Sequence, residues 1–334
     1  MSGKLPSGHT YKELEGEESE VLKERFHLYQ EGIVLANPGN YYLPKPFVDF
    51  AEKIYNFEEI VWNLVKNPDL NNPEADISID SRCPFFEVDY IFCFTDGPKY
   101  DPKGELIRSF YKHFPDKDPI RDGLMIHLAS VHPDPRLLKN HLPYTFLPED
   151  MLKKAKTVCL ARDPRDIAVS GYHYHKLQKI LDYTGTLEEF VDDFMNDRVP
   201  VPFGPWWDHM RLHWEIRNHP NFLLLFYEDL KENPEAEIKK IDKFLGTKRT
   251  DEQIKNVARY TSFSNMKERT KRNPPTSFDN AFFKKEVEEK GGSFFRKGKA
   301  GSWKEDLPPH LQEKMNSWMK ENLTRFDDDF KYKA

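Results

Sequence analysis

The second half of the chain alternates short, continuously apolar runs with longer amphipathic segments. The apolar runs lie at 157–161 and 222–227, and each is too short for a helix but suits a strand that is buried on both faces. A helical pattern of apolar residues follows each run. This alternation predicts an α/β fold in which helices flank a parallel sheet.

Cap residues indicate where the helices of this half begin. Asp163-Pro164 and Asn233-Pro234 each place a cap residue before a proline, which suits the first position of a helix. Thr186 and Thr250 are each followed three residues later by Glu or Gln, the pattern of a capping box. Amphipathic spacing predicts two more helices, over 206–217 and 311–323.

The first half carries weaker patterns. Residues 1–24 are polar and acidic, and we expect a flexible N-terminal segment there. Asn37-Pro38-Gly39-Asn40 has the composition of a turn, and apolar spacing predicts a helix over 47–65. Residues 67–123 are rich in Pro, Asp and Gly and are interpreted as a long loop that covers a site. Without a repeat or a clear linker, residues 25–334 are expected to form one domain.

Composition narrows the class of protein. The net charge of −6 argues against general nucleic-acid binding, which needs a strongly basic face. Three cysteines without CxxC spacing argue against a disulfide framework or a zinc cage and fit a reducing compartment. His173 and His175 would point to different sides of a helix, so they do not make a metal pair. With no signal-peptide core and no membrane-length apolar run, we expect a cytoplasmic protein without membrane contact.

The stretch 294–304 combines positive charge with glycine and has aromatic residues toward both ends. Its cations and glycines are Arg296, Lys297, Gly298, Lys299, Gly301 and Lys304. Glycine lets backbone N–H groups approach a ligand closely, and fixed cations beside such groups make an anion site of the kind that phosphates occupy. A solvated basic loop is the alternative interpretation.

Three side chains are expected at the carboxyl end of the parallel sheet, where ligands bind in open α/β folds. Arg162 follows the first predicted strand, Ser170 lies about two turns into the next helix, and Tyr227 ends the second strand. Arg162 and Ser170 are close enough to share a phosphate. The alternatives are an ion pair between Arg162 and Asp166 and a core position for the Tyr227 ring.

Two further segments carry candidate chemistry. His141 stands close to Lys139 just before a proline-ended loop, and a neutral imidazole is the usual general base near pH 7. Thr261 and Phe263 follow a predicted helix and are close to further cations. A structural histidine and an ordinary helix C-terminal turn are the alternatives.

Together these segments resemble the cytosolic sulfotransferases, which move a sulfuryl group from 3′-phosphoadenosine 5′-phosphosulfate (PAPS) to a hydroxyl or amine. The similarity runs from about residue 40 to the end, and the segments around Arg162 and Tyr227 look closest to the insect branch that includes retinol dehydratase. The matching segments stand in the order of the family: 139–143, 160–166 with Ser170, 226–230, 261–267 and 296–304.

The resemblance implies a role for each candidate residue. The residues implied to hold the 3′-phosphate of PAPS are Arg162, Ser170, Arg296, Lys297 and Gly298. Those implied to contact the rest of the nucleotide are Tyr227, Thr261, Phe263 and Phe295. His141 would take the acceptor proton as general base, and Lys139 would lie near the transferred sulfuryl group. The displacement requires no metal.

The resemblance also implies partners. The acceptor would be a small hydrophobic or aromatic alcohol or phenol, which fits the aromatic residues at 83–111 and Trp206 and Trp207. The chain would be a monomer or a homodimer, since Pro308-Pro309-His310 stands where the dimer motif of the family has a Thr-Val pair.

One family segment has no counterpart. The family carries a central strand followed by a Pro-Lys-Ser-Gly-Thr-Thr-Trp loop that cradles the 5′-phosphosulfate, and no glycine occurs here between Gly39 and Gly97. About twenty residues are missing relative to the family pattern. We therefore expect a P-loop-like parallel sheet that lacks one central strand and its loop, with two family helices fused within 47–65.

Three functions follow as hypotheses from these observations. The first is a sulfotransferase whose activity is weakened by the missing loop. The second is an inactive nucleotide-binding or regulatory module, or a splice form, that keeps only the 3′-phosphate half of the site. A P-loop kinase is disfavoured because no Gly-Lys-Ser/Thr sequence occurs in the chain.

Overall fold

The structure is a computed structural model of the chain. It describes residues 2–5, 8–26, 29–30, 33–37, 41–44, 59–76, 79–85, 89, 104–148, 150–178, 181–200, 205–272, 284, 287 and 297–334.

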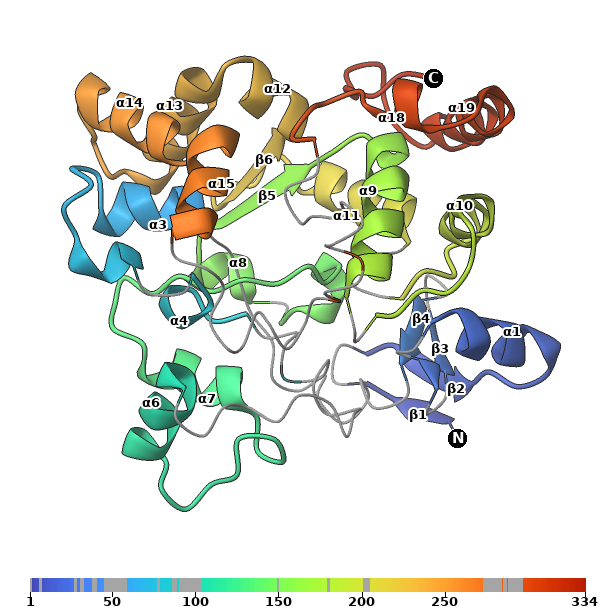
Figure 1. The fold of residues 1–334 in the computed structure, drawn as a ribbon, viewed down its shortest axis with the longest axis horizontal. Coiled ribbons are helices and arrows are strands. Elements are labelled where there is room, and N and C mark those ends of the chain that lie inside the picture. The colour runs from blue at the N-terminus through green and yellow to red at the C-terminus, as the bar shows by residue number, and fades with distance from the viewer. Residues whose placement is uncertain are drawn as a thin grey trace.

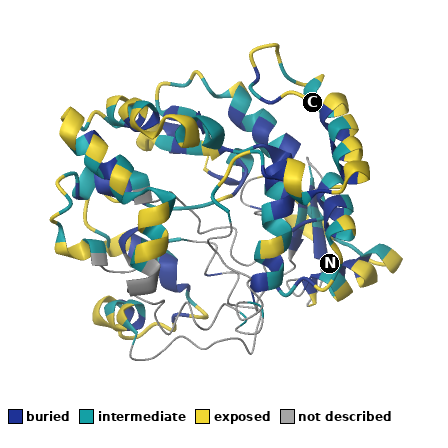
Figure 2. Ribbon diagram, turned by 45° about the horizontal axis from the view of Figure 1, so that its top comes forward, coloured by how far each residue is buried: buried dark blue, intermediate teal, exposed yellow. Residues whose placement is uncertain are grey.

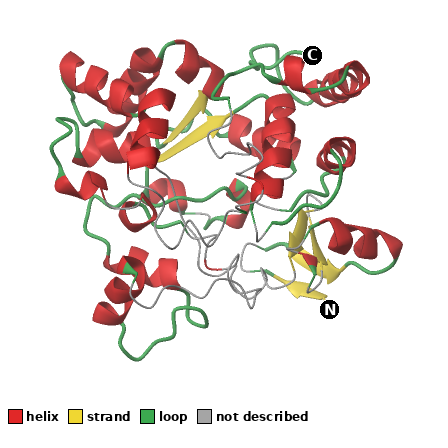
Figure 3. Ribbon diagram, viewed as in Figure 1, coloured by secondary structure: helices red, strands yellow, loops and turns green. Residues whose placement is uncertain are grey.

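Two sheets lie in different parts of the molecule (Figure 1). The N-terminal sheet is antiparallel, with strands β1 (Ser2–Lys4), β2 (Thr10–Glu13), β3 (Ile33–Asn37) and β4 (Tyr41–Pro44). The second sheet pairs β5 (Thr157–Ala161) with β6 (Phe222–Phe226) in parallel. Its helices lie on either side, as Figure 3 shows, so the predicted α/β fold with a flanked parallel sheet is confirmed.

The register of the parallel pair brings two candidate residues to one edge. Thr157 pairs with Phe222 and Ala161 pairs with Phe226, so both strands end at the same level. Arg162 follows β5 directly, and Tyr227 follows β6 directly as the first residue of helix α12. The predicted strand 222–227 is therefore one residue too long, because Tyr227 already belongs to the helix.

The predicted caps of the second half are confirmed. Asp163 caps α9 and accepts the Arg165 N–H, and Asn233 caps α13. Both capping boxes are complete, at Thr186 before α10 and Thr250 before α14. The helices of this half are α8 (Met151–Lys154), α9 (Pro164–Leu177), α10 (Leu187–Met195), α11 (Trp206–Glu215), α12 (Tyr227–Glu232), α13 (Pro234–Leu245), α14 (Asp251–Tyr260), α15 (Phe263–Arg272), α18 (Trp303–Asp306) and α19 (Pro309–Leu323).

The first half contains more secondary structure than its composition suggested. Residues 1–24, expected to be flexible, include β1, β2 and most of helix α1 (Glu17–Arg25). The region read as one long loop contains several short helices, and α6 buries Ile107 and Phe110, three residues apart on one face. The helices described in this region are η2 (Pro73–Asp76), α4 (Ile79–Arg82) and α6 (Glu105–His113). Two more follow it, α7 (Leu124–Val131) and η4 (Tyr144–Phe146).

The predicted helix 47–65 is described only at its end. Helix α3 runs over Glu59–Lys66, and residues 45–58 lie outside the described residues. The fused helix and the missing central strand therefore stay predictions from the sequence.

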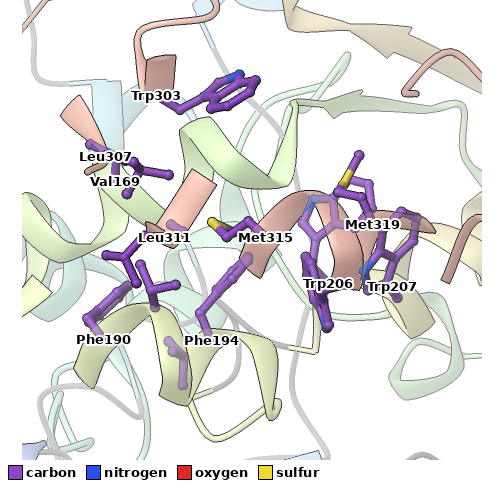
Figure 4. Close-up of a cluster of buried hydrophobic side chains, with 14 of the residues drawn as sticks. Val169, Phe190, Phe194, Trp206, Trp207, Trp303, Leu307, Leu311, Met315 and Met319 are labelled. Carbon is purple, nitrogen blue, oxygen red and sulfur yellow. The ribbon is translucent and has the colours of Figure 1, made fainter. Parts of the chain in front are cut away.

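A large aromatic core supports the carboxyl end of the parallel sheet. Figure 4 shows side chains of α18 and α19 among those of α9, α10 and α11, and Figure 2 shows these faces as buried. Met315 is fully buried, and burying a side chain of this kind contributes about 1.5–3 kcal/mol. This packing fixes α18, and with it the glycine-rich segment that precedes it.

Candidate nucleotide and acceptor site

Arg162 connects the two strand ends with the basic loop, defined here as residues 297–302. Its Cζ lies 4.6 Å from the centroid of the Tyr227 ring, and its Nη2 donates to the Lys299 carbonyl at 3.3 Å. Its Nε is buried and has no hydrogen-bond partner among the described residues. A buried guanidinium N–H without a partner requires an explanation, and a bound anion supplies one.

Asp166 holds the basic loop against helix α9. The carboxylate is fully buried and accepts the Gly301 N–H at 2.7 Å and the Trp303 N–H at 2.9 Å. It also lies 3.4 Å from Arg162 Nη2, so the alternative ion pair of Arg162 is observed. That pairing does not exclude the anion site, because the same carboxylate brings the glycine-rich backbone to Arg162.

Gly298 packs against Phe263 at a distance that only glycine permits. Its φ is +63°, and a Cβ built on it would lie 2.4 Å from Phe263 Cδ2. Phe263 is the first residue of α15, and the Lys231 ammonium lies 5.7 Å from its ring centroid. The structure thus brings together Gly298 and Phe263, two residues from separate segments that the family resemblance implies for one nucleotide site.

Two other predicted ligands have internal partners. The Thr261 hydroxyl donates to the Val257 carbonyl at 2.8 Å, which is the ordinary helix-end role. The Lys297 ammonium donates to Asp306 at 2.7 Å and to Glu305 at 3.0 Å, and these hydrogen bonds raise the pKa of Lys297. Lys297 would have to share its charge between these carboxylates and a phosphate.

Ser170 lies on α9 one helical turn beyond Asp166, and it is half-buried. This spacing puts Ser170 on the face of α9 that carries Asp166. Phe295 and Arg296 lie outside the described residues, so their predicted contacts stay predictions.

A cavity of about 760 Å³ adjoins Arg162 and contains the two candidate catalytic residues. Lys139, His141 and every residue of β5 line it, which places it along this strand. Its volume is typical of sites for small molecules. Apolar side chains including Trp206 and Met210 of α11 line another part of it.

Phe85 lies between the two candidate catalytic side chains. The Lys139 ammonium is 4.8 Å from the Phe85 ring centroid, and the His141 ring meets the same ring edge-on at 5.2 Å. The backbone N–H of Lys139 donates to the Pro84 carbonyl at 3.0 Å, which keeps the segment that contains Lys139 and His141 beside Phe85. The sequence did not identify Phe85 individually, although it lies in the aromatic stretch 83–111.

Two histidines, the buried His213 and the half-buried His209, line the cavity with a cysteine and were not predicted. Cys159 Sγ lies 3.2 Å from His213 Nδ1, and the rings of His213 and His209 are 4.5 Å apart. Burial lowers the pKa of His213 to about 4 and raises the pKa of the Cys159 thiol to about 12. Burial, with the neighbouring His213 and His141, also puts the pKa of His209 well below its ordinary value. The i, i+4 spacing of the two histidines on a predicted helix was the available signal.

These neutral side chains do not form a metal centre. Among the described residues, no group of three His, Cys, Asp or Glu side chains has an arrangement that could hold a metal ion. The cavity lining combines apolar side chains with the neutral groups of α11 and β5 and with charged residues that include Lys139, Lys156 and Arg162.

The buried histidines predict a pH-dependent stability. His213 and the fully buried His175 each have a folded-state pKa of about 4, below the ordinary 6.5. The unfolded chain therefore takes up protons first, and the free energy of unfolding should fall as the pH drops from 6.5 to 4, by up to about 3 kcal/mol for each histidine. Urea unfolding across this range measures the effect. His213→Phe should flatten the dependence and the exposed control His310→Gln should not; equal pH profiles for all three proteins would contradict the assignment.

In the part of the chain that the structure describes, no helix is long and apolar enough to span a membrane.

Comparisons with known proteins agree on one family. The sequence model described as "Sulfotransferase domain" matches residues 57–327. "Sulfotransferase 1 family member D1" from Mus musculus is 37% identical over 209 residues, which are 62% of this chain and 68% of that protein. "Sulfotransferase 1A1" from Rattus norvegicus is 37% identical over 204 residues, 60% of this chain and 67% of that protein.

Two solved structures of retinol dehydratase resemble the whole chain. The complex with retinol and PAP has a TM-score of 0.75 at 25% identity and covers 99% of this chain and 100% of that chain. The complex with androsterone and the inactive cofactor PAP has a TM-score of 0.74 at 26% identity and covers 99% of both chains.

Proposed function

Because this chain belongs to the sulfotransferase family, we propose that it binds PAPS and transfers the sulfuryl group to a small hydrophobic alcohol, phenol or amine. The observation that carries the proposal is the position of Arg162. Its guanidinium lies against Tyr227 and reaches the basic loop at Lys299, and Arg162 is also one of the residues that line the cavity beside His141. One side chain thus joins an anion site to a cavity large enough for an acceptor.

The nucleotide would lie across the ends of β5 and β6. Arg162, with its buried Nε, and Ser170 of the following helix α9 would bind the 3′-phosphate. Gly298 lets the backbone of the basic loop come close, with Arg296 and Lys297 adding charge. The PAP in both retinol dehydratase structures supports a nucleotide of this kind. Further nucleotide contacts are proposed for Tyr227, Thr261, Phe263 and Phe295.

The chemistry would take place in the cavity beside Lys139 and His141. His141 would take the proton of the acceptor hydroxyl as the acceptor oxygen bonds to sulfur and the bond from sulfur to the 5′-phosphate oxygen breaks. Lys139 would stabilise the charge of the transferred group. This in-line displacement uses no metal and leaves 3′,5′-ADP as the product nucleotide.

The apolar lining of the cavity supports a hydrophobic acceptor. Retinol and androsterone, bound in the two retinol dehydratase structures, are small hydrophobic molecules. The cytoplasmic location and the choice between monomer and homodimer stay predictions from the sequence.

A second candidate function rests on the missing loop. The sequence has no counterpart of the family loop that cradles the 5′-phosphosulfate. Each lost donor of this kind typically costs about 10²–10³ in rate. An inactive nucleotide-binding or regulatory module that keeps the 3′-phosphate half of the site is therefore the alternative.

A transfer assay separates the two functions. With PAPS and a panel of phenols, alcohols and amines, we expect slow transfer that His141→Ala lowers by about 10²–10⁴, because general acid–base catalysis contributes that much. His310→Ala, an exposed histidine away from the cavity, is the control and should leave the rate unchanged. No transfer by a protein that still binds 3′,5′-ADP would reject the enzyme and support the nucleotide-binding module.

A further inference from the structure

Residues 330–333, called the tail segment here, bind the residues that flank the nucleotide site. The Tyr332 hydroxyl donates to Glu228 Oε2 at 2.8 Å, and Glu228 Oε1 accepts the Asp163 N–H at 3.0 Å. Asp163 directly follows Arg162, and Glu228 directly follows Tyr227. One carboxylate therefore links the turn after β5 to the tail segment.

A second set of contacts holds the same turn from Arg165. Its guanidinium binds both carboxylate oxygens of Asp163, at 2.7 and 3.0 Å. It also donates to Asn316 Oδ1 of α19 at 2.7 Å and to the Lys333 carbonyl at 3.1 Å, and it stacks on the Trp303 ring at 4.2 Å. Asp163 and Arg165 are both buried, so these charges depend on one another.

The tail segment also contacts the end of β6. The Tyr332 ring lies 5.5 Å from the Phe226 ring, and the Lys331 ammonium donates to Asp229 at 2.5 Å. Burial, and next the charge of Glu228, raise the pKa of Tyr332 well above its ordinary value, so its hydroxyl remains a donor. The tail segment thus contacts residues that neighbour both Arg162 and Tyr227 in the sequence: Arg165 near the first, and Phe226 and Glu228 on either side of the second.

We propose that the tail segment is a positioning element of the nucleotide site, in which Tyr332 acts through Glu228 and Asp163 on the placement of Arg162. The inference rests on the proposed PAPS site. A guanidinium that binds a phosphate must be held within a fraction of an ångström by its supporting contacts. The Asp163 N–H is the backbone group next to Arg162, so its hydrogen bond to Glu228 fixes the direction in which the Arg162 side chain leaves the chain.

Two matched substitutions test the proposal by calorimetric titration of 3′,5′-ADP and 5′-AMP. Tyr332→Phe is the test variant and Tyr29→Phe is the control, and each removes the hydroxyl of one buried tyrosine. The Tyr29 hydroxyl donates to the Arg198 carbonyl at 3.1 Å, away from the proposed nucleotide site. Tyr332→Phe should weaken 3′,5′-ADP binding about threefold to tenfold, since it removes one of the two hydrogen bonds that hold the half-buried Glu228 carboxylate beside Asp163. The affinity for 5′-AMP, which lacks the 3′-phosphate, should not change. Tyr29→Phe should change neither affinity.

A double-mutant cycle identifies the route. In an Arg162→Ala background, Tyr332→Phe should cause no further loss, because the residue through which it acts is gone. If Tyr332→Phe does not fold, Glu228→Gln replaces it, since the amide has only one oxygen for two donors. If Tyr332→Phe and Tyr29→Phe change the affinity for 3′,5′-ADP equally, while Arg162→Ala weakens it, the positioning role of Tyr332 is overturned. The proposed nucleotide site would still stand in that case. No binding of 3′,5′-ADP by the unaltered protein would overturn the proposed function and this inference with it.

Discussion

Replacing Asp166 by alanine is expected to lower the free energy of unfolding by about 2–3 kcal/mol, because Asp166 is a buried carboxylate whose charged partner, Arg162, is partly exposed. Asp166 is fully buried and accepts the N–H groups of Gly301 and Trp303. The substitution leaves these two donors without a partner and removes the counter-charge of Arg162. Asp166→Asn should lose less, because the amide oxygen still accepts from the loop.

Urea unfolding measures this effect, and an exposed aspartate provides the control. Asp192 of α10 pairs with Lys314 across the surface, and a surface ion pair contributes about 0–1 kcal/mol. Asp192→Ala should therefore remain close to the unaltered protein. If Asp166→Ala were no less stable than Asp192→Ala, Asp166 would not be the group that fixes the basic loop to α9.

Replacing Gly298 by alanine is expected to weaken binding of 3′,5′-ADP by about tenfold or more, which corresponds to about 1.4 kcal/mol. The new Cβ would lie 2.4 Å from Phe263, and a left-handed φ of +63° costs a further 1–2 kcal/mol, roughly, for a residue with a Cβ. The backbone of the loop and the Phe263 ring must then move apart, although both are proposed to contact the nucleotide.

Gly246→Ala is the control that separates the steric clash of a new Cβ with Phe263 from the energetic cost of a positive φ in a residue with a Cβ. Gly246 ends α13 with a φ of +78°, and nothing lies within 4 Å of the position of its Cβ. This variant should lose some stability and keep its nucleotide affinity. Unchanged affinity in Gly298→Ala as well would show that the contact between Gly298 and Phe263 is not part of a nucleotide site.

The parts of the fold that the sequence predicted depend on local signals. Asp163 with Pro164 and the two capping-box threonines satisfy backbone donors within a few residues, so their sequence pattern is sufficient. The two strands were likewise visible as apolar runs bounded by helix starts.

The parts that were missed depend on partners far away in the sequence. β1 is exposed throughout and β2 is partly exposed, so neither has an apolar pattern. β2 is held by pairing with β3, whose Ile33, Val34 and Ala36 are fully buried. Sequence spacing alone does not show which polar segment pairs with such a strand.

The same limit applies within the site. The sequence paired Asp166 only with Arg162, four residues away, whereas its bonds to Gly301 and Trp303 join separate segments. The contact of His213 with Cys159 also joins a helix to a strand, and no sequence motif indicated this pairing. Family resemblance supplied the grouping of Arg162, Phe263 and Gly298, and the structure adds the packing of Gly298 on Phe263 and the hydrogen bond from Arg162 to the Lys299 carbonyl.

The most direct test of the central claim is a calorimetric comparison of 3′,5′-ADP with 5′-AMP on the unaltered protein and on Arg162→Ala. Charged hydrogen bonds contribute about 1.5–3 kcal/mol, so the unaltered protein should prefer 3′,5′-ADP by about ten- to a hundredfold. Arg162→Ala should abolish this preference. Equal affinities of the unaltered protein for the two nucleotides would contradict a 3′-phosphate site at Arg162.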